Sequence, residues 1–103
     1  MRFVLGALSL AFIAATPGPA HADMELLRKK NCFACHGIDK RKDGPTFAEI
    51  AAKYVGDSGA VERLAKRIQV GGSGVWGEGL MPPQPQVSDA DAVVLAKFVL
   101  SLK

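Results

Sequence analysis

The sequence predicts an all-α domain of about four short helices. Two stretches place apolar residues at the i, i+3, i+4, i+7 spacing of one helix face, and a further apolar stretch follows a serine suited to capping a helix. No segment alternates polar and apolar residues as a half-buried strand does. With 103 residues and no internal repeat, the chain has room for one domain.

The first predicted helix covers residues 24–30, with Asp23 as its N-cap. The second predicted helix stops before Gly56 and Asp57, which favour a turn. Its apolar face comprises Phe47, Ile50, Ala51 and Tyr54.

The third predicted helix has Ser58 as its N-cap and ends at Gly71 and Gly72. Its apolar face comprises Val61, Leu64, Ala65 and Ile68. The fourth begins at Ser88, with Asp91 three positions later as in a capping box. Its inward side is expected to comprise Val94, Phe98 and Leu102, with Ala90 and Val93 beside them.

Residues 71–87 differ in composition from the rest of the chain. They include five glycines and three prolines, which suit neither a helix nor a sheet. Trp76 and Met81 also lie here, and a solvated linker seldom carries such residues. We therefore expect an ordered loop that wraps over a surface.

Residues 32–36 read C-x-x-C-H, the attachment pattern of a c-type haem. Cys32 and Cys35 are spaced so that each thiol can bond one vinyl group of the same porphyrin, and His36 then lies below the iron as proximal ligand. A thioredoxin-like redox pair would need a βαβ context, and a zinc site would need two further ligands. Because His21 is the only other Cys or His, the motif predicts one covalently bound haem c.

Residues 1–22 have the layout of a secretory signal peptide. Arg2 precedes an apolar run over residues 3–15, and residues 20–22 read A-x-A. This run is shorter than the about 20 residues that a membrane span needs, and an uncleaved anchor is the alternative. We predict cleavage after residue 22 and a mature domain of residues 23–103 in the periplasm, with no stable membrane insertion. There both cysteines would be used as thioethers rather than paired as a disulfide.

The mature domain is small, and this limits its protein core. A covalent haem would supply the staple that such a domain usually needs, so we expect the four helices to pack around it. The net charge of +3 falls to +2 without Arg2, which is too mild a charge to indicate nucleic-acid binding.

Counting the residues able to bind iron reduces the number of candidates for the second iron ligand. Cleavage would leave His36 as the only histidine, so the candidates are Met24, Met81, Tyr54, a lysine or an open site. Met24 lies near the new terminus on the attachment side, whereas Met81 is distant in sequence and is followed by two stiffening prolines. Met81 is favoured, with simple core packing as the alternative. Because His/Met iron has no open position, it favours electron transfer over catalysis, and we expect no enzyme activity.

Together with the C-x-x-C-H motif, Gly44-Pro45, Trp76 and Met81-Pro82-Pro83 resemble the short bacterial class I cytochromes c. These are periplasmic single-haem carriers associated with nitrite reductase and terminal oxidases. The resemblance covers essentially the whole of the mature chain. It includes the runs Ile50-Ala51-Ala52-Lys53, Gly74-Val75-Trp76-Gly77, Val87-Ser88-Asp89 and Leu95-Ala96-Lys97.

The resemblance implies a role for each site residue. Cys32 and Cys35 would hold the haem, with His36 and Met81 as axial ligands. The Pro45 carbonyl would accept a hydrogen bond from the far ring nitrogen of His36. The remaining two residues, Arg67 and Trp76, would reach a haem propionate. The plainer alternatives are a turn residue for Pro45, a solvated charge for Arg67 and packing for Trp76.

Two departures from the family pattern are visible. Gln84 stands where the family often has an asparagine that hydrogen-bonds the methionine sulfur, and residues 78–80 replace a more proline-rich stretch. Both put the orientation of Met81 in question.

The expected partners are redox proteins: nitrite reductase or a cytochrome oxidase as acceptor and a bc1-type complex as donor, with the protein itself a monomer. Positive residues flank the motif and are expected to steer acidic partners, or else form a solvated face. They are Lys29, Lys30, Lys40, Arg41 and Lys42. Two other functions stay open, a haem sensor or enzyme with an open sixth iron site and a tethered haem domain of a larger respiratory complex.

Overall fold

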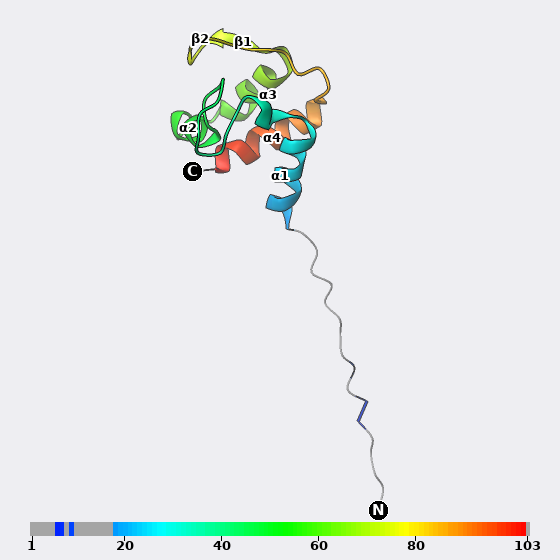
Figure 1. Ribbon diagram of the computed structural model, residues 1–103. Helices are drawn as coiled ribbons and strands as arrows, with labels where there is room; N and C mark the ends of the chain where they lie inside the picture. The colour runs from blue at the N-terminus through cyan, green and yellow to red at the C-terminus, as the bar shows by residue number, and fades with distance from the viewer. Residues whose placement is uncertain (1–5, 8, 10–17, 103) are drawn as a thin grey trace, which may run out of the picture.

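The computed structural model describes residues 6–7, 9 and 18–102 (Figure 1). Most of the predicted signal peptide therefore lies outside the described residues. In the described part, the α-helices are α1 (Pro19–Lys29), α2 (Phe47–Lys53), α3 (Ala60–Val70) and α4 (Asp89–Ser101). A short 3-10 turn, η1 (Cys32–Ala34), follows α1. The prediction of a domain with four short helices is confirmed.

Two helices have an N-cap residue whose side chain accepts a hydrogen bond from a free backbone N–H group of the first turn. Ser88 Oγ accepts a hydrogen bond of 3.1 Å from the Asp91 N–H, which confirms the predicted start of α4. Thr46 Oγ1 accepts one of 3.0 Å from the Glu49 N–H at the start of α2. This second cap is not among the predicted ones.

The other two predicted helix starts are wrong. Helix α1 begins at Pro19 behind Gly18, five residues before the predicted position, because proline at the first helical position already has a helical φ. Helix α3 begins at Ala60 behind Gly59 rather than directly after Ser58. Asp57 supplies the turn here, since its Oδ1 accepts a hydrogen bond of 2.9 Å from the Gly59 N–H.

The segment over residues 71–87 contains a small hairpin, so the prediction that it forms no sheet is wrong. Strand β1 (Gly72–Gly74) pairs antiparallel with β2 (Gly77–Met81), with Gly72 opposite Met81. Gly74 and Gly77 have φ angles of +95° and +99°, which lets the chain reverse between them. Most of the hairpin is exposed, so no face of it must alternate with a core. Figure 1 shows the hairpin set apart from the helices.

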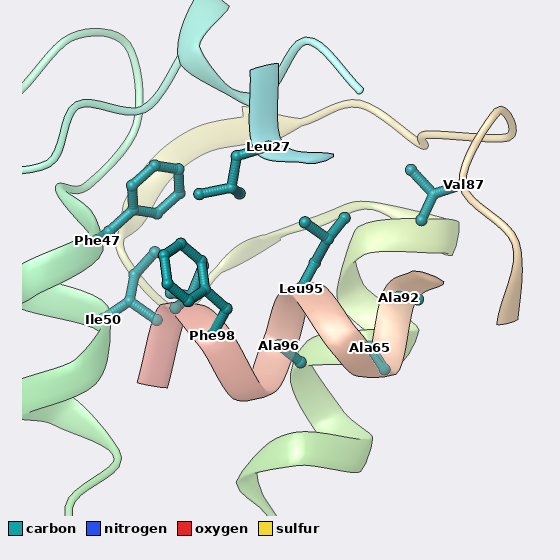
Figure 2. Close-up of a cluster of buried hydrophobic side chains, with 10 residues drawn as sticks. Leu27, Phe47, Ile50, Ala65, Val87, Ala92, Leu95, Ala96 and Phe98 are labelled. Atoms are coloured by element: carbon teal, nitrogen blue, oxygen red, sulfur yellow. The ribbon is translucent and has the colours of Figure 1, made fainter. Parts of the chain in front are cut away.

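Helix α4 is the centre of the fold and packs against α1, α2 and α3. Figure 2 shows apolar side chains from α1, α2 and α3 converging on it. Leu27 of α1 and Leu95 of α4 are the largest fully buried side chains, and Phe47 and Ile50 of α2 lie beside Phe98.

The predicted inward face of α4 is only partly correct. Phe98 is buried and Leu102 is half-buried against the core, but the side chains of Ala90, Val93 and Val94 are exposed. The other buried residues of α4 are Ala92, Leu95, Ala96 and Val99. Because α4 is apolar nearly all round, its own periodicity does not select a face. The positions of its neighbouring helices do.

Within the described part of the chain, none of the helices combines the length and the apolar character needed to cross a bilayer.

Candidate haem-binding site

A single cavity is bounded by residues from all four helices and both strands. Its lining includes Leu27 of α1, Ile50 of α2, Leu64 of α3 and Leu95 of α4, so much of its wall is apolar. The structure brings all seven predicted site residues to this cavity. They are Cys32, Cys35, His36, Pro45, Arg67, Trp76 and Met81.

The attachment motif forms a tight turn. The backbone N–H groups of Cys35 and His36 both donate to Cys32 O, at 3.3 and 3.1 Å. Asn31 has a left-handed φ of +66°, and this turns the chain out of α1 and into the motif. Both cysteines are half-buried and free of a disulfide. Burial raises the pKa of the Cys32 thiol, with a backbone hydrogen bond acting in the opposite direction.

The ring of His36 is held on two sides. Its Nδ1 lies 2.7 Å from Pro45 O, and because a carbonyl oxygen can only accept, Nδ1 carries the proton. Nε2 of the neutral ring is then free to bind a metal. Phe47 stacks on the ring with centroids 5.3 Å apart and an angle of 26° between the planes. A Cβ at Gly44 would lie 2.8 Å from Cε1 of this ring, so only glycine leaves room for it.

The loop after the motif is tied back onto it. Gly44 N donates to Cys35 O at 2.8 Å, and Lys42 Nζ donates to Phe33 O at 2.7 Å. Arg41 makes two-pronged hydrogen bonds to Glu49 of α2, at 2.9 Å from Nε to Oε1 and 2.7 Å from Nη2 to Oε2. This bond holds the pKa of the Glu49 carboxyl below its usual value and raises that of Arg41. Sequence reasoning missed these contacts and the stack of Phe47, since spacing along the chain does not show them.

Met81 approaches the same cavity from the end of β2 and is half-buried. Tyr54 also lines the cavity, whereas Met24 packs against the core away from it and no lysine is among the lining residues. The two candidates for a second ligand that reach the cavity are therefore Met81 and Tyr54. The side chain of Gln84 is engaged elsewhere, because its Nε2 donates to Pro82 O at 3.1 Å.

Arg67 of α3 and Trp76, in the turn between β1 and β2, both border the cavity. Arg67 is half-buried, its Nη1 lies 3.4 Å from Gly71 O, and it has no ion-pair partner among residues 18–102. Trp76 is 38 % exposed, and Lys53 Nζ lies 5.2 Å from the centroid of its ring, a cation–π contact. A half-buried cation without a carboxylate partner suits an anionic group in the cavity.

The family model of cytochrome c matches residues 24–103. The chain belongs to the cytochrome c family. Several bacterial cytochromes c are similar to it over most of their length. Cytochrome c-552 of Hydrogenobacter thermophilus is 45% identical over 94 residues, covering 91% of this chain and 95% of the relative. Cytochrome c-552 of Nitrosomonas europaea is 49% identical over 86 residues, covering 84% of each.

The solved structures agree with the family assignment. The crystal structure of Nitrosomonas europaea cytochrome c552 superposes with a TM-score of 0.76 at 48% identity, covering 78% of this chain and 99% of that one. A class 1 cytochrome from Sideroxydans lithotrophicus superposes with a TM-score of 0.63 at 33% identity, covering 79% and 92%. The fold is that of a class I cytochrome c, as the sequence predicted.

The residues of this cytochrome c fit the haem c that its family binds covalently. Two thiols, an imidazole with one nitrogen free and a thioether reach one largely apolar cavity, and Gly44 leaves space for the imidazole. A zinc site is not supported, since no three His, Cys, Asp or Glu side chains gather among the described residues. The relatives matched over most of the chain are cytochromes c, and the protein is a small haem-containing electron carrier rather than an enzyme.

Proposed function

We propose that this cytochrome c is a periplasmic one-electron carrier with His36 and Met81 as axial ligands of its iron. The observation that carries the proposal is one cavity in which a doubly held imidazole and a thioether are both available. A haem c bound here would supply a one-electron Fe(III)/Fe(II) couple.

Each residue then has a defined task. Cys32 and Cys35 would bond the porphyrin as thioethers, and His36 would offer Nε2 to the iron. The hydrogen bond to Pro45 fixes the orientation and the tautomer of the ring. The neutral thioether of Met81 favours ferrous iron and keeps other molecules from the sixth position.

Arg67 and Trp76 serve the propionate side of the proposed site. The guanidinium lines the cavity, where it could pair with a haem carboxylate and so offset the burial of both charges. Lys53 adds a further positive charge above the Trp76 ring. Lys53 does not line the cavity, so Arg67 is the residue here that would meet an anionic group with a charge of opposite sign.

The proposed partners are a nitrite reductase or a terminal oxidase as acceptor and a bc1-type complex as donor, met by a monomeric carrier. The positive residues around the motif are not equally free to steer them. Arg41 pairs with Glu49, and Lys30 and Lys42 are bonded to backbone carbonyls. Lys29 and Lys40 remain the candidates, and the rate of electron transfer should fall as ionic strength rises.

Periplasmic location rests on residues 1–22 acting as a cleaved signal peptide. Mass spectrometry of the secreted protein should find Asp23 as the first residue and a mass increased by one haem. An intact segment over residues 2–22 would instead favour a membrane-tethered haem domain.

The decisive test of ligation is the absorption spectrum of the ferric protein. A weak far-red band appears when a methionine sulfur binds ferric iron, and we expect it in the native protein. Met81→Ala should abolish the band, allow carbon monoxide to bind the reduced iron and lower the reduction potential by on the order of 0.1 V or more, because axial ligands set the potential.

Tyr54→Phe is the matched control, since Tyr54 lines the same cavity. It should keep the band. A high-spin native spectrum that carbon monoxide shifts would contradict Met81 ligation and move the protein toward the class of sensors or enzymes.

A further inference from the structure

The segment between Met81 and Val87 is poor in backbone donors. Three of its five residues are prolines (82, 83 and 85), which have no N–H group. The Gln84 N–H donates to Ile68 O of α3 at 3.0 Å and fixes one point. The Val87 N–H donates to Gln84 O at 3.1 Å and closes a turn within the segment. The other contacts that tie the segment to the rest of the fold involve side chains.

Gln86 provides such an anchor together with Lys30. Gln86 Nε2 donates to Lys30 O at 3.2 Å, and Lys30 Nζ donates to Gln86 O at 3.1 Å. We call this reciprocal pair the Lys30–Gln86 clasp. Lys30 is the C-cap of α1 and lies two residues before Cys32, so the clasp joins the attachment side of the cavity to the Met81 side.

The clasp continues toward Met81 through side chains. Gln86 Nε2 also donates to Gln84 Oε1 at 2.7 Å, and Gln84 Nε2 donates to Pro82 O at 3.1 Å. Pro82 is the residue next to Met81. A chain of hydrogen bonds thus runs from the end of α1 to the neighbour of the proposed ligand.

The position of Lys30 is itself restrained. Its side chain is only 19% exposed, and Nζ lies 3.8 Å from Asp91 Oδ2 of α4. On the far side of the segment, Gln69 of α3 donates to Val87 O at 3.2 Å and to Asp89 Oδ1 at 2.7 Å. The segment after Met81 is therefore held to α1 on one side and to α3 on the other.

We propose that Lys30 and Gln86 are positioning residues for Met81, and that the clasp sets how often Met81 leaves the iron. The inference rests on the proposed ligation by Met81. Departure of this ligand requires residues 81–86 to move outward, and this movement breaks the hydrogen bonds of the clasp. Each bond that is removed makes the open state more populated.

The test uses the ferric holoprotein with imidazole as an added ligand, which can bind the iron only when Met81 has left. The far-red band reports the displacement. Gln86→Met and Lys30→Met keep the approximate side-chain size and remove the donors. Each should tighten imidazole binding by about two- to tenfold, because one hydrogen bond shifts the population of the open state by that order and the apparent affinity scales with this population. The double variant should gain less than the sum of the two, because the two bonds join the same two segments and losing one already loosens the other.

Two controls separate positioning from general stability. Lys97→Met removes an exposed lysine of α4 and should change neither imidazole affinity nor melting temperature. Phe98→Leu lies in the core outside the cavity lining and should lower the melting temperature while leaving imidazole affinity unchanged. Unchanged affinity in Gln86→Met and Lys30→Met, with the band present in the native protein, would overturn the clasp alone. Absence of the band from the native protein would overturn Met81 ligation and the clasp with it.

Discussion

His36 shows how much a single ligand depends on its neighbours. The carbonyl of Pro45 accepts a hydrogen bond from Nδ1 of the ring, and Phe47 stacks on one face of it. Gly44 leaves the space that the ring occupies. The sequence reveals the ligand from its motif, because covalent attachment demands a fixed spacing. The stack of Phe47 could not be predicted, since its helical spacing indicates only that it faces a core.

The ion pair of Arg41 and Glu49 predicts how the stability of the fold depends on pH. The pKa of Glu49 is lowered in the folded protein, so the pair stabilises the fold above the ordinary Glu pKa of about 4.3. This contribution is lost as the pH falls through the lowered value. Glu49→Gln should therefore reduce the free energy of unfolding at pH 7 and have a smaller effect at pH 3, as measured by urea unfolding.

Glu78→Gln is the control for this measurement, since Glu78 is exposed on β2. It should be nearly neutral at both pH values. An effect of Glu49→Gln that is equal at the two pH values would contradict an ionic contribution.

At the scale of the elements, helix α4 depends on its cap. Ser88→Ala removes the acceptor for the Asp91 N–H and should cost about 1 kcal/mol in the free energy of unfolding. Ser58→Ala is a sharp control, because its sequence suggests a cap and the structure places Gly59 there instead. It should cost no more than a few tenths of a kcal/mol. Equal losses in the two variants would contradict the capping role of Ser88.

The junction of α3 and the hairpin requires glycine. Gly71 has a φ of +68°, and a Cβ there would lie 2.7 Å from Pro83 N. Gly71→Ala should therefore lower the free energy of unfolding by about 1–3 kcal/mol, because both its backbone and its neighbours must shift. Gly79→Ala places a Cβ with no protein atom within 4 Å, at a glycine without a positive φ, and is the matched control in the same urea experiment. A Gly71→Ala protein as stable as this control would contradict the steric argument.

The elements also mark the limit of sequence reasoning. Ser88 predicts the start of α4 correctly, but the sequence does not predict its buried face, because apolar residues surround this helix and the neighbouring helices decide which of them are buried. The hairpin was missed for the opposite reason. Its strands are exposed and rich in glycine, so the sequence shows neither an alternating apolar pattern nor the β-branched residues that are typical of strands.

For the whole molecule, the seven predicted site residues could be named from the sequence because haem binding demands particular residue types within recognisable motifs. What the sequence could not supply was the set of polar contacts that ties distant segments, such as Lys30 to Gln86. Those contacts depend on three-dimensional placement and leave no periodic pattern.

The cavity borders every helix, so the protein core alone is small. A Cys32→Ala/Cys35→Ala variant prepared without haem should lose most of its helical circular dichroism and its cooperative thermal transition. The holoprotein is the reference. A haem-free variant that melts cooperatively at the temperature of the holoprotein would contradict this dependence.

The position at which α1 begins has a consequence for the processed chain. The first turn of this helix starts at Pro19 and contains no acidic residue. Cleavage after Ala22 would remove that turn and leave Asp23 and Glu25 in the new one, next to a fresh ammonium group at the positive pole of the helix. The two carboxylates would offset the repulsion between this ammonium group and the positive end of the helix dipole. Cleavage by the signal peptidase would thus shorten α1. The shortened helix would begin at the residues whose negative charges favour the positive N-terminal end of the helix dipole.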